Sequence, residues 1–362
     1  MTGADVGANP LVDLIVAVHD PTRPIERAVA SALNGNPGIP LRVSVVVHNT
    51  DAQPIRRRLG GLAHDPRTRV LELHDGIRSP AGPFNLGLEH ATGTYTSVMG
   101  SDDVLDPGAV TSWARRAQRV DADVVIARTR LSGGRAVPTP PTRPFRRSHL
   151  DPIKDRLSYR SAPLGLVSRA RFGTLRFAAG LPVGEDVPYV LRLWFSDAHV
   201  AYDRWGPAYR IHEDALERTT VSPRPIASEL AHVTCVTDDT WFRSLDPASR
   251  DAIGTKILRV HVFGAVANRQ DTRLWTIADR QDLARFVERV LDFAPGAAHP
   301  LAASERAALD LTLASRVPVG ALIDTVRRRR MGVGALVPRQ RRSLFAREAP
   351  VRMATASVLQ LL

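Results

Sequence analysis

Cysteine is almost absent from this sequence, since Cys235 is the only one among 362 residues. A single cysteine excludes an internal disulfide framework and any zinc site built from several cysteines. Long apolar runs are also missing, because no stretch reaches the roughly 18 residues needed to cross a bilayer. The first residues, MTGADVGANP, lack the basic and apolar segments of a signal peptide. We therefore expect a cytoplasmic protein, either soluble or peripheral at the inner face of the cell membrane.

Lysine is the second scarce residue. Lys154 and Lys256 are the only two, so arginine supplies nearly all of the positive charge in a chain of formal net charge +12. The planar guanidinium group donates paired hydrogen bonds to phosphate and other oxyanions. Such a surface fits anionic lipid, nucleic acid or an anionic substrate, and charge alone does not choose among them. No nucleic acid is expected, because the arginines are scattered without interleaved aromatic residues.

Glycine-rich phosphate-binding loops are missing as well. The apolar run at residues 14–18 continues directly into HDPTRP, without the G-x-G-x-x-G pattern of dinucleotide enzymes, and no P-loop occurs elsewhere. A nucleotide bound by this chain must therefore be held by groups other than a glycine-rich turn. A divalent cation on carboxylates would serve, because hard cations prefer oxygen ligands and bridge phosphate oxygens.

The first part of the sequence alternates short apolar runs with helical patterns. This rhythm predicts an α/β fold with a largely parallel sheet, whose ligands bind at the carboxyl ends of the strands. Polar residues stand at three of these ends, in HDP (19–21), HNTD (48–51) and SDD (101–103). The expected strands are the β-branched runs at 14–18, 43–47, 70–73, 95–99 and 123–127, and a helix is expected at 24–33.

The remainder of the chain divides into an irregular, a helical and a basic part. Residues 131–163 are rich in proline and arginine and predict either a lid or binding loop or a solvated linker. We predict domains at 1–220 and 221–325 and a basic amphipathic tail at 326–362, which would lie on anionic lipid, dock on a partner or on its own domain, or fray. Two apolar helix faces support the helical domain: Leu283, Phe286, Val287, Val290 and Leu291, and Ile253, Ile257 and Val260.

Two pairs of adjacent carboxylates stand out. Asp102 and Asp103 follow the strand at 95–99, where each disfavours ionisation of the other unless solvent, a basic partner or a bound cation relieves the repulsion. Glu185 and Asp186 precede a helical pattern, and a helix N-terminus favours negative charge for dipole reasons alone. Each pair therefore has a structural explanation beside a functional one.

The order of several motifs resembles the nucleotide-sugar glycosyltransferases of the GT-A fold, and more narrowly the inverting glycosyltransferase family 2. The motifs are AVHDP, VVVHNTD, NLGLEHATGTYTSVMGSDDVLDPGAV, GEDVPYVLRL and YRIHED, and the likeness covers about residues 11–220. It implies a Rossmann-like, mostly parallel sheet flanked by helices, which the smaller, mainly helical domain predicted above would follow. It also implies transfer of a sugar from a nucleotide donor, with UDP preferred, to a hydroxyl of a cell-envelope glycan, a polyol-phosphate polymer or a lipid-linked acceptor.

The resemblance further implies roles for individual residues. Asp102 would contact ribose or metal, and Asp103 would ligate a divalent metal, Mn²⁺ or Mg²⁺, with His212 as a further ligand. Asp186, with Glu185 as second choice, would be the general base that deprotonates the acceptor hydroxyl. The nucleotide would be bound by Val18, His19, Asp20, Asn49, Asn85, Asp102 and Arg210.

The sequence departs from the family at the acidic motif. Its commonest form reads Asp-Ser-Asp-Asp, whereas Gly100 replaces the first acid here, which leaves metal dependence open. A rival hypothesis is a GT-A-like fold that has lost catalysis and serves as a binding or scaffolding module, and Gly100, His48 and Asn49 favour it. The presence of both carboxylate pairs together with His212 opposes it.

Overall fold

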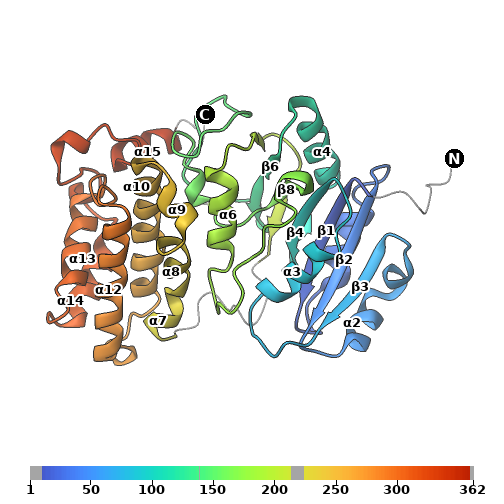
Figure 1. Cartoon of the computed structure of the whole chain (residues 1–362), viewed down its shortest axis with the longest axis horizontal. Coiled ribbons are helices and arrows are strands. Elements are labelled where there is room, and N and C mark those ends of the chain that lie inside the picture. Colours follow the sequence, from blue (N-terminus) through green and yellow to red (C-terminus); the bar gives the residue numbers. More distant parts are fainter. Residues whose placement is uncertain (1–9, 138, 213–223, 359–362) are drawn as a thin grey trace.

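The structure, a computed structural model, describes residues 10–137, 139–212 and 224–358. In this part of the chain the main sheet has seven strands in the order β3-β2-β1-β4-β8-β6-β9 (Figure 1). Strand β8 is antiparallel to both of its neighbours, and the remaining neighbouring pairs are parallel. The expected mostly parallel α/β sheet is confirmed. The strands are β1 (Val12–Val18), β2 (Leu41–His48), β3 (Thr68–Leu73), β4 (Tyr95–Gly100), β6 (Val124–Ala127), β8 (Gly165–Ser168) and β9 (Val200–Asp203).

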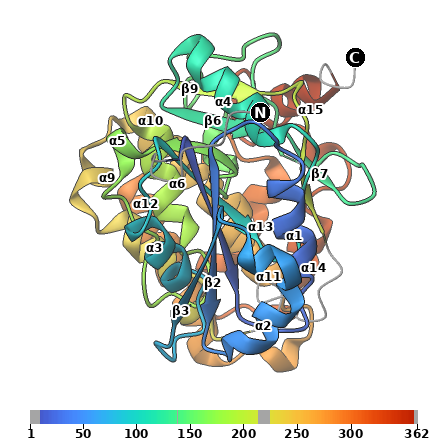
Figure 2. The ribbon, with the colours of Figure 1, turned by 90° about the vertical axis from the view of Figure 1, so that its right-hand side faces the viewer.

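Helices cover both faces of the sheet because its strands are apolar on both sides. In β1, Leu14 and Val16 belong to the core shared with α1, α2 and α4, whereas Ile15 belongs to the core shared with α3 and α6. Figure 2 shows α3 on the opposite side of the sheet from α1 and α2. These helices are α1 (Ile25–Leu33), α2 (Ala52–Leu59), α3 (Ala81–Glu89), α4 (Ala109–Val120) and α6 (Asp186–Phe195).

A small second sheet stands beside the acidic motif. Its order is β5-β10-β7, formed by β5 (Val104–Leu105), β10 (Tyr209–Ile211) and β7 (Thr129–Leu131). Strand β10 pairs antiparallel with β5, so that Tyr209 lies opposite Leu105. This pairing brings the segment that ends at His212 alongside Asp102 and Asp103.

The C-terminal part is helical and shares its core with the sheet domain. One continuous apolar cluster includes residues of α3, α6 and the helices from α7 to α14, and Figure 1 shows α6 between the sheet and these helices. The helices are α7 (Ile226–Glu229), α8 (Ala231–Thr237), α9 (Thr240–Ser244), α10 (Pro247–Lys256), the π-helix η4 (Ile257–Val262), α11 (Phe263–Ala267), α12 (Ile277–Phe293), α13 (Ala303–Leu313), α14 (Val319–Arg328) and α15 (Pro350–Val358). Shorter elements are α5 (Arg169–Phe172) and the 3₁₀ turns η1 (Gly60–His64), η2 (Leu157–Tyr159), η5 (Thr272–Leu274), η6 (Val333–Ala335) and η7 (Arg341–Ser343).

One predicted helix face is wrong at Val260. Ile253 and Ile257 are fully buried as expected, but Val260 is 42% exposed. The reason is the π-helical segment η4, whose i→i+5 hydrogen bonds widen the turn and rotate later residues away from the α-helical register. Val262 takes the buried position instead.

The segment before α15 docks on the chain itself, which was one of three alternatives for the basic tail. The Arg156 guanidinium donates to the carbonyl oxygen of Arg347 over 3.0 Å, and the Tyr159 hydroxyl donates to Glu348 Oε2 over 2.8 Å. Arg259 Nη1 donates to the Glu348 carbonyl over 2.9 Å. Helix α14 continues past the predicted domain limit at residue 325, and the limit at 220 lies outside the described residues.

The irregular region at 131–163 is anchored within the protein. Asp155 is fully buried and accepts hydrogen bonds from the Arg143 amide at 2.8 Å and from Arg143 Nη2 at 2.6 Å. Phe145, two residues after Arg143, is 97% exposed. Residues 139–163 are therefore anchored through the contact of Arg143 with Asp155, whereas Phe145 is open to solvent. Of the helices described, none combines the length and the apolar character that a bilayer crossing requires.

Candidate active site

Three parallel strands bring the predicted polar residues to one edge of the sheet. Strand β1 lies between β2 and β4, with Val18 opposite Val47 and Ala17 opposite Gly100, so the three strands end at the same level. Helix α6 leads into β9, which is parallel to β6. A helix that returns the chain to a parallel strand begins at the carboxyl edge of the sheet. Glu185 and Asp186, at the start of α6, therefore lie at the same edge as Asp102 and Asp103.

Asp103 is held by the small sheet. The Tyr209 hydroxyl donates to Asp103 Oδ2 over 2.5 Å, and the His212 amide donates to Oδ1 over 2.9 Å. The Gly100 amide donates to the Tyr209 oxygen over 3.0 Å. Burial raises the pKa of Asp103, and these hydrogen bonds oppose that rise. The pairing of β10 with β5 thus fixes the orientation of the second acid.

The same contacts explain the acid that is missing at position 100. A Cβ atom on Gly100 would lie 2.6 Å from Asp103 Oδ2 and 3.3 Å from Asp102 Oδ1. The carboxylate of Asp103 therefore occupies the space that any side chain at position 100 would need. Gly100 is the residue that lets Tyr209 and Asp103 meet above the strand end.

Asp102 has a basic partner, which was one of the three remedies for the adjacent charges. Arg23 Nη1 lies 2.6 Å from Asp102 Oδ2, and Arg27 Nη2 donates to the Asp102 carbonyl oxygen over 2.5 Å. Arg23 lies in the loop between β1 and α1, and Arg27 lies in the first turn of α1. Sequence reasoning missed them, although their position after the HDP motif was a usable signal, because this loop faces the end of β4.

The end of β2 forms a second polar cluster. Asp75 Oδ1 accepts hydrogen bonds from His48 Nε2 at 2.8 Å and from Asn49 Nδ2 at 3.0 Å. Partial burial would raise the pKa of Asp75, but the Ile77 amide and these two side chains lower it to about 2. The Gly76 amide donates to Asn49 Oδ1 over 3.0 Å. Asn49 therefore braces the loop after β3, and Asp75 is a further acidic residue at this edge that sequence reasoning missed.

The remaining nucleotide candidates are spread around this edge. Val18 is fully buried in the core, whereas His19 is exposed at the end of β1. Asp20 accepts hydrogen bonds from the Thr22 amide at 2.8 Å and from its hydroxyl at 2.7 Å, and the amide bond lowers the pKa of Asp20 most. Arg210 forms an ion pair with Asp106.

The side chain of Asn85 binds backbone. Its Nδ2 donates to the carbonyl of Phe177 over 3.0 Å, and its Oδ1 accepts from the Phe177 amide at 2.8 Å. The Phe177 ring stacks on Tyr189 of α6 with 4.3 Å between centroids. The Ala178 amide then donates to the Glu185 carbonyl over 3.1 Å. Asn85 thus connects α3 to the loop that positions Glu185, and its role at the nucleotide stays a prediction.

The surroundings of Glu185 and Asp186 act differently on the pKa values of the two carboxyl groups. Burial, followed by repulsion from Asp186, raises the pKa of Glu185. Burial also raises the pKa of Asp186, but the ammonium group of Lys256 acts against that rise. Lys256 therefore favours the ionised form of Asp186, and the charge of Asp186 in turn favours the protonated form of Glu185.

The predicted metal ligands fit a divalent cation by their chemistry. The carboxylates of Asp102 and Asp103 and the imidazole of His212 are ligand types that Mn²⁺ or Mg²⁺ accepts. Both oxygens of Asp103 already accept hydrogen bonds, and Asp102 is paired with Arg23. Over the described residues, no three His, Cys, Asp or Glu side chains are arranged to hold a metal ion. A cation would have to share Asp102 with Arg23.

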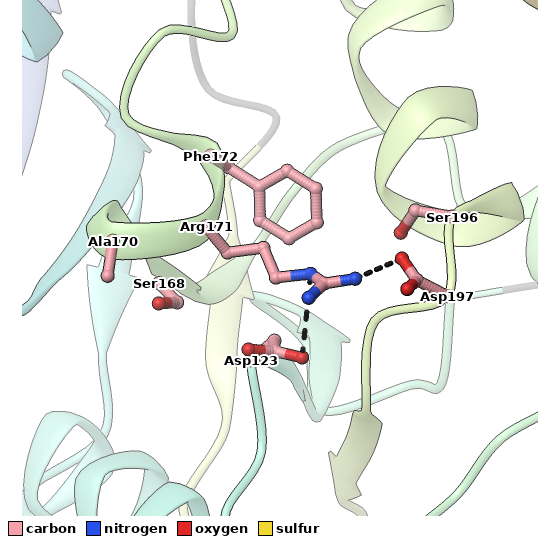
Figure 3. A pocket seen from close by; sticks show the side chains of 7 residues that line it. All are labelled: Asp123, Ser168, Ala170, Arg171, Phe172, Ser196 and Asp197. Carbon is pink, nitrogen blue, oxygen red and sulfur yellow. Dashed lines mark hydrogen bonds and ion pairs between the residues drawn. The ribbon is translucent and has the colours of Figure 1, made fainter.

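A surface hollow of about 580 Å³ lies at the other edge of the sheet (Figure 3). Arg171 crosses it, forming an ion pair with Asp197 and lying 3.9 Å from Asp123 Oδ2. Asp123 immediately precedes β6, so this hollow faces the amino ends of the parallel strands. It is separate from the residues described above.

Comparisons with known proteins agree with this geometry. Residues 13–178 match the family described as Glycosyl transferase family 2. A stretch of 118 residues is 33% identical to "Succinoglycan biosynthesis protein ExoO" of Rhizobium meliloti (strain 1021), and this match covers 32% of the chain and 32% of that relative. The comparison thus spans about a third of the curated relative's length.

The solved structures extend the likeness to most of the chain. S. aureus TarS 1-349 in complex with UDP-GlcNAc is 16% identical with a TM-score of 0.70, and the match covers 88% of this chain and 91% of that one. TarS 1-349 in complex with UDP is 15% identical with a TM-score of 0.66, with the same coverage of both chains. Similarity at this level of identity shows the fold. Residues 13–178 of this chain form a glycosyl transferase family 2 domain, built on the GT-A fold.

Proposed function

We propose that this protein is an inverting glycosyltransferase that moves a sugar from a nucleotide donor to an acceptor hydroxyl. One observation carries the proposal: two carboxylate pairs, Asp102–Asp103 and Glu185–Asp186, lie at the carboxyl edge of a family 2 domain's sheet, the first beside Arg23 and the second under the electrostatic influence of Lys256. Ligands of such sheets bind at this edge. One pair faces the donor diphosphate and the other the acceptor.

Asp186 is the general base in this proposal. A single inverting displacement needs a carboxylate that takes the proton of the acceptor hydroxyl as its oxygen attacks the anomeric carbon. Lys256 favours the ionised form of Asp186, whereas repulsion by Asp186 favours the protonated form of Glu185. Glu185 then serves as a hydrogen-bond donor or a spare proton site, and the N-terminus of α6 supports the negative charge of Asp186.

The donor diphosphate binds beside Asp102 and its two arginine neighbours, Arg23 and Arg27. Asp102, Asp103 and His212 would hold a divalent cation, Mn²⁺ or Mg²⁺, which supplies positive charge to the diphosphate oxygens. Arg23 and Arg27 lie at Asp102 already and add charge-assisted hydrogen bonds to the same oxygens. Positive charge at this place stabilises the nucleoside diphosphate as it leaves.

The donor we propose is a UDP-sugar. The polar groups of His19, Asp20 and Asn49 stand at the ends of β1 and β2, where they can read the base and the ribose. The complex of TarS with UDP-GlcNAc supports this choice of nucleotide. The acceptor class is a cell-envelope glycan, a polyol-phosphate polymer or a lipid-linked sugar, which the succinoglycan role in the name of ExoO supports for a glycan.

We also propose that the basic tail, which begins at residue 326, binds an anionic membrane surface. Met331, Val333 and Phe345 are 69%, 77% and 78% exposed, in a region with several arginines. Apolar side chains among arginines suit the interface of anionic lipid. Co-sedimentation with phosphatidylglycerol vesicles but not with phosphatidylcholine vesicles is the expected result, and equal binding to both would contradict the proposal.

The experiment for the proposed function measures donor binding and turnover together. Calorimetry with UDP and Mn²⁺ should show binding that Asp102→Ala weakens at least about tenfold, since one good charged contact contributes on the order of 1.4 kcal/mol. Hydrolysis of a UDP-sugar should fall in the same variant. A scaffolding module without catalysis would bind no nucleotide in a metal-dependent way and would show no turnover, and the pairing of Asp102 with Arg23 is the observation that favours that rival.

A further inference from the structure

The helical region contributes a buried charge beneath the start of α6. Lys256, the last residue of α10, is fully buried, although lysine is used at only one other position in the whole chain. Burial of an ammonium group is costly unless a partner compensates it. The other lysine, Lys154, lies on the surface, with a side chain that is 66% exposed. We therefore expect a specific partner for the buried ammonium group of Lys256.

A chain of contacts connects Lys256 to the carboxylates. Lys256 Nζ lies 2.6 Å from His261 Nε2, and the His261 ring packs edge-on against His232 of α8 with 4.4 Å between centroids. Gly184 adopts φ +74°, and a Cβ there would lie 2.5 Å from His232 Nδ1. The turn that delivers Glu185 and Asp186 therefore lies directly against the imidazole of His232.

Lys256 provides the positive charge of this cluster and Asp186 the negative charge, and the two histidines are neutral. Lys256 interacts electrostatically with Asp186, and burial lowers the pKa of Lys256 to about 8 while Asp186 opposes that fall. Burial, then the charge of Lys256, lowers the pKa of both His232 and His261, so both rings are neutral. A neutral His261 can accept a hydrogen bond from the ammonium group. Among the described residues, the titratable groups facing this charge are Asp186, with Glu185 next to it, from α6, His232 from α8, and His261 from η4.

We propose that Lys256 is the buried counter-charge of the Asp186 carboxylate, so that the helical region acts as part of the catalytic apparatus through this positioning residue. The inference rests on the proposed function and deepens it, because it explains how a partly buried base stays ionised. Lysine suits the position better than arginine, since a compact ammonium group fits beneath the turn and places its charge at one point.

The first test is the pH profile of kcat/KM. Lys256→Met removes the charge at similar volume, and Lys256→Gln removes the charge but keeps a hydrogen-bond donor for His261. Both should move the acidic limb upward by about one pH unit or more, because removal of an opposite charge raises the pKa of a carboxyl group. Near pH 6 the rate should fall about tenfold, with recovery at high pH and an unchanged KM for the donor. Lys154→Met is the matched control and should keep the wild-type profile.

The second test does not depend on turnover. Thermal unfolding of the wild type, Lys256→Met, Asp186→Asn and the double variant is measured at pH 5.5 and pH 7.5. Lys256→Met should lose more stability at pH 7.5, where Asp186 is ionised without a counter-charge, and Asp186→Asn should cancel that difference. An additive double variant together with an unmoved acidic limb would overturn the inference. Full activity in Asp186→Asn would instead overturn the assignment of the base, which the unfolding cycle distinguishes.

Discussion

At the scale of single residues, Gly100 decides how the acidic motif is built. The Tyr209 hydroxyl joins the Gly100 amide to the Asp103 carboxylate, and that carboxylate lies where a side chain at position 100 would stand. Restoring the acid that the family motif carries would therefore push Asp103 out of place. The glycine is a packing requirement of the Tyr209 contact, and the two carboxylates that remain are oriented by protein hydrogen bonds and by Arg23.

Gly100→Ala tests this directly. The new Cβ would displace Asp103 Oδ2 and break its hydrogen bond with Tyr209, so the affinity for UDP should fall at least about tenfold. Overall stability should change little, because the displaced atom is the end of a side chain. Titration calorimetry measures the affinity. Gly61→Ala is the control, since a Cβ at Gly61 meets nothing within 4 Å, and equal affinity in both variants would contradict the prediction.

Glu185 provides a stability prediction with a defined sign. Burial and Asp186 raise its folded-state pKa to about 7, so its contribution to stability is present at low pH and is lost as pH rises through that value. Glu185→Gln removes the buried charge and should stabilise the protein at pH 8 by about 1 kcal/mol. At pH 4 the variant and the wild type should unfold alike. Urea unfolding at the two pH values measures the difference, and a stabilisation independent of pH would disagree with this account.

At the scale of elements, the strands and the crossover helices were predictable, but the contacts between distant elements were not. Runs such as 14–18 and 43–47 alternate or repeat apolar residues with a strand's period, and they became β1 and β2. The π-helix at 257–262 was not predictable from an α-helical period, which is why Val260 was misplaced. The Arg23 and Lys256 contacts were also missed, because apolar periodicity carries no information on which charged side chains meet.

Asn85 belongs to this scale because it joins α3 to the loop before α6. Asn85→Asp cannot donate to the Phe177 carbonyl, so the loop that orients Glu185 should loosen. We expect kcat to fall about tenfold while the affinity for UDP stays within about threefold. Steady-state kinetics with a titration of UDP separates the two. A loss confined to UDP affinity would instead support the role that the resemblance implied, direct contact with the nucleotide.

At the scale of the whole molecule, the segment before α15, which contains Glu348, connects the sheet domain to the helical region. Arg259 of η4 lies 3.0 Å from Glu305 Oε2 of α13 and 3.4 Å from Glu348 Oε2, and Glu348 also accepts from Tyr159 of η2. The apolar core continues from α3 through α6 to α14. Because the two parts share this core, we expect them to unfold together, without a sheet domain that is stable alone.

Arg259→Met should show how much the contacts of Arg259 with Glu305 and Glu348 contribute to the stability of the protein. The substitution leaves Glu305 and Glu348 without their guanidinium, and loss of one partner of a buried ion pair costs about 3 kcal/mol or more. Urea unfolding measures it. Arg273→Met, which removes an exposed ion pair with Asp271, should leave the unfolding midpoint unchanged. Similar unfolding midpoints for the two variants would mean that the contacts of Arg259 do not stabilise the packing of the helical region on the sheet domain.

In the proposed mechanism, Asp186 takes the proton of the acceptor while the Asp102–Asp103 pair serves the donor. The most direct measurement compares transfer from a UDP-sugar by the wild type and by Asp186→Asn, with UDP affinity determined on the same samples. If Asp186 is the general base, kcat should fall by a factor of about 10² to 10⁴, the contribution of a general base, with UDP affinity within about threefold of the wild type. Undiminished turnover in Asp186→Asn at unchanged UDP affinity would contradict it.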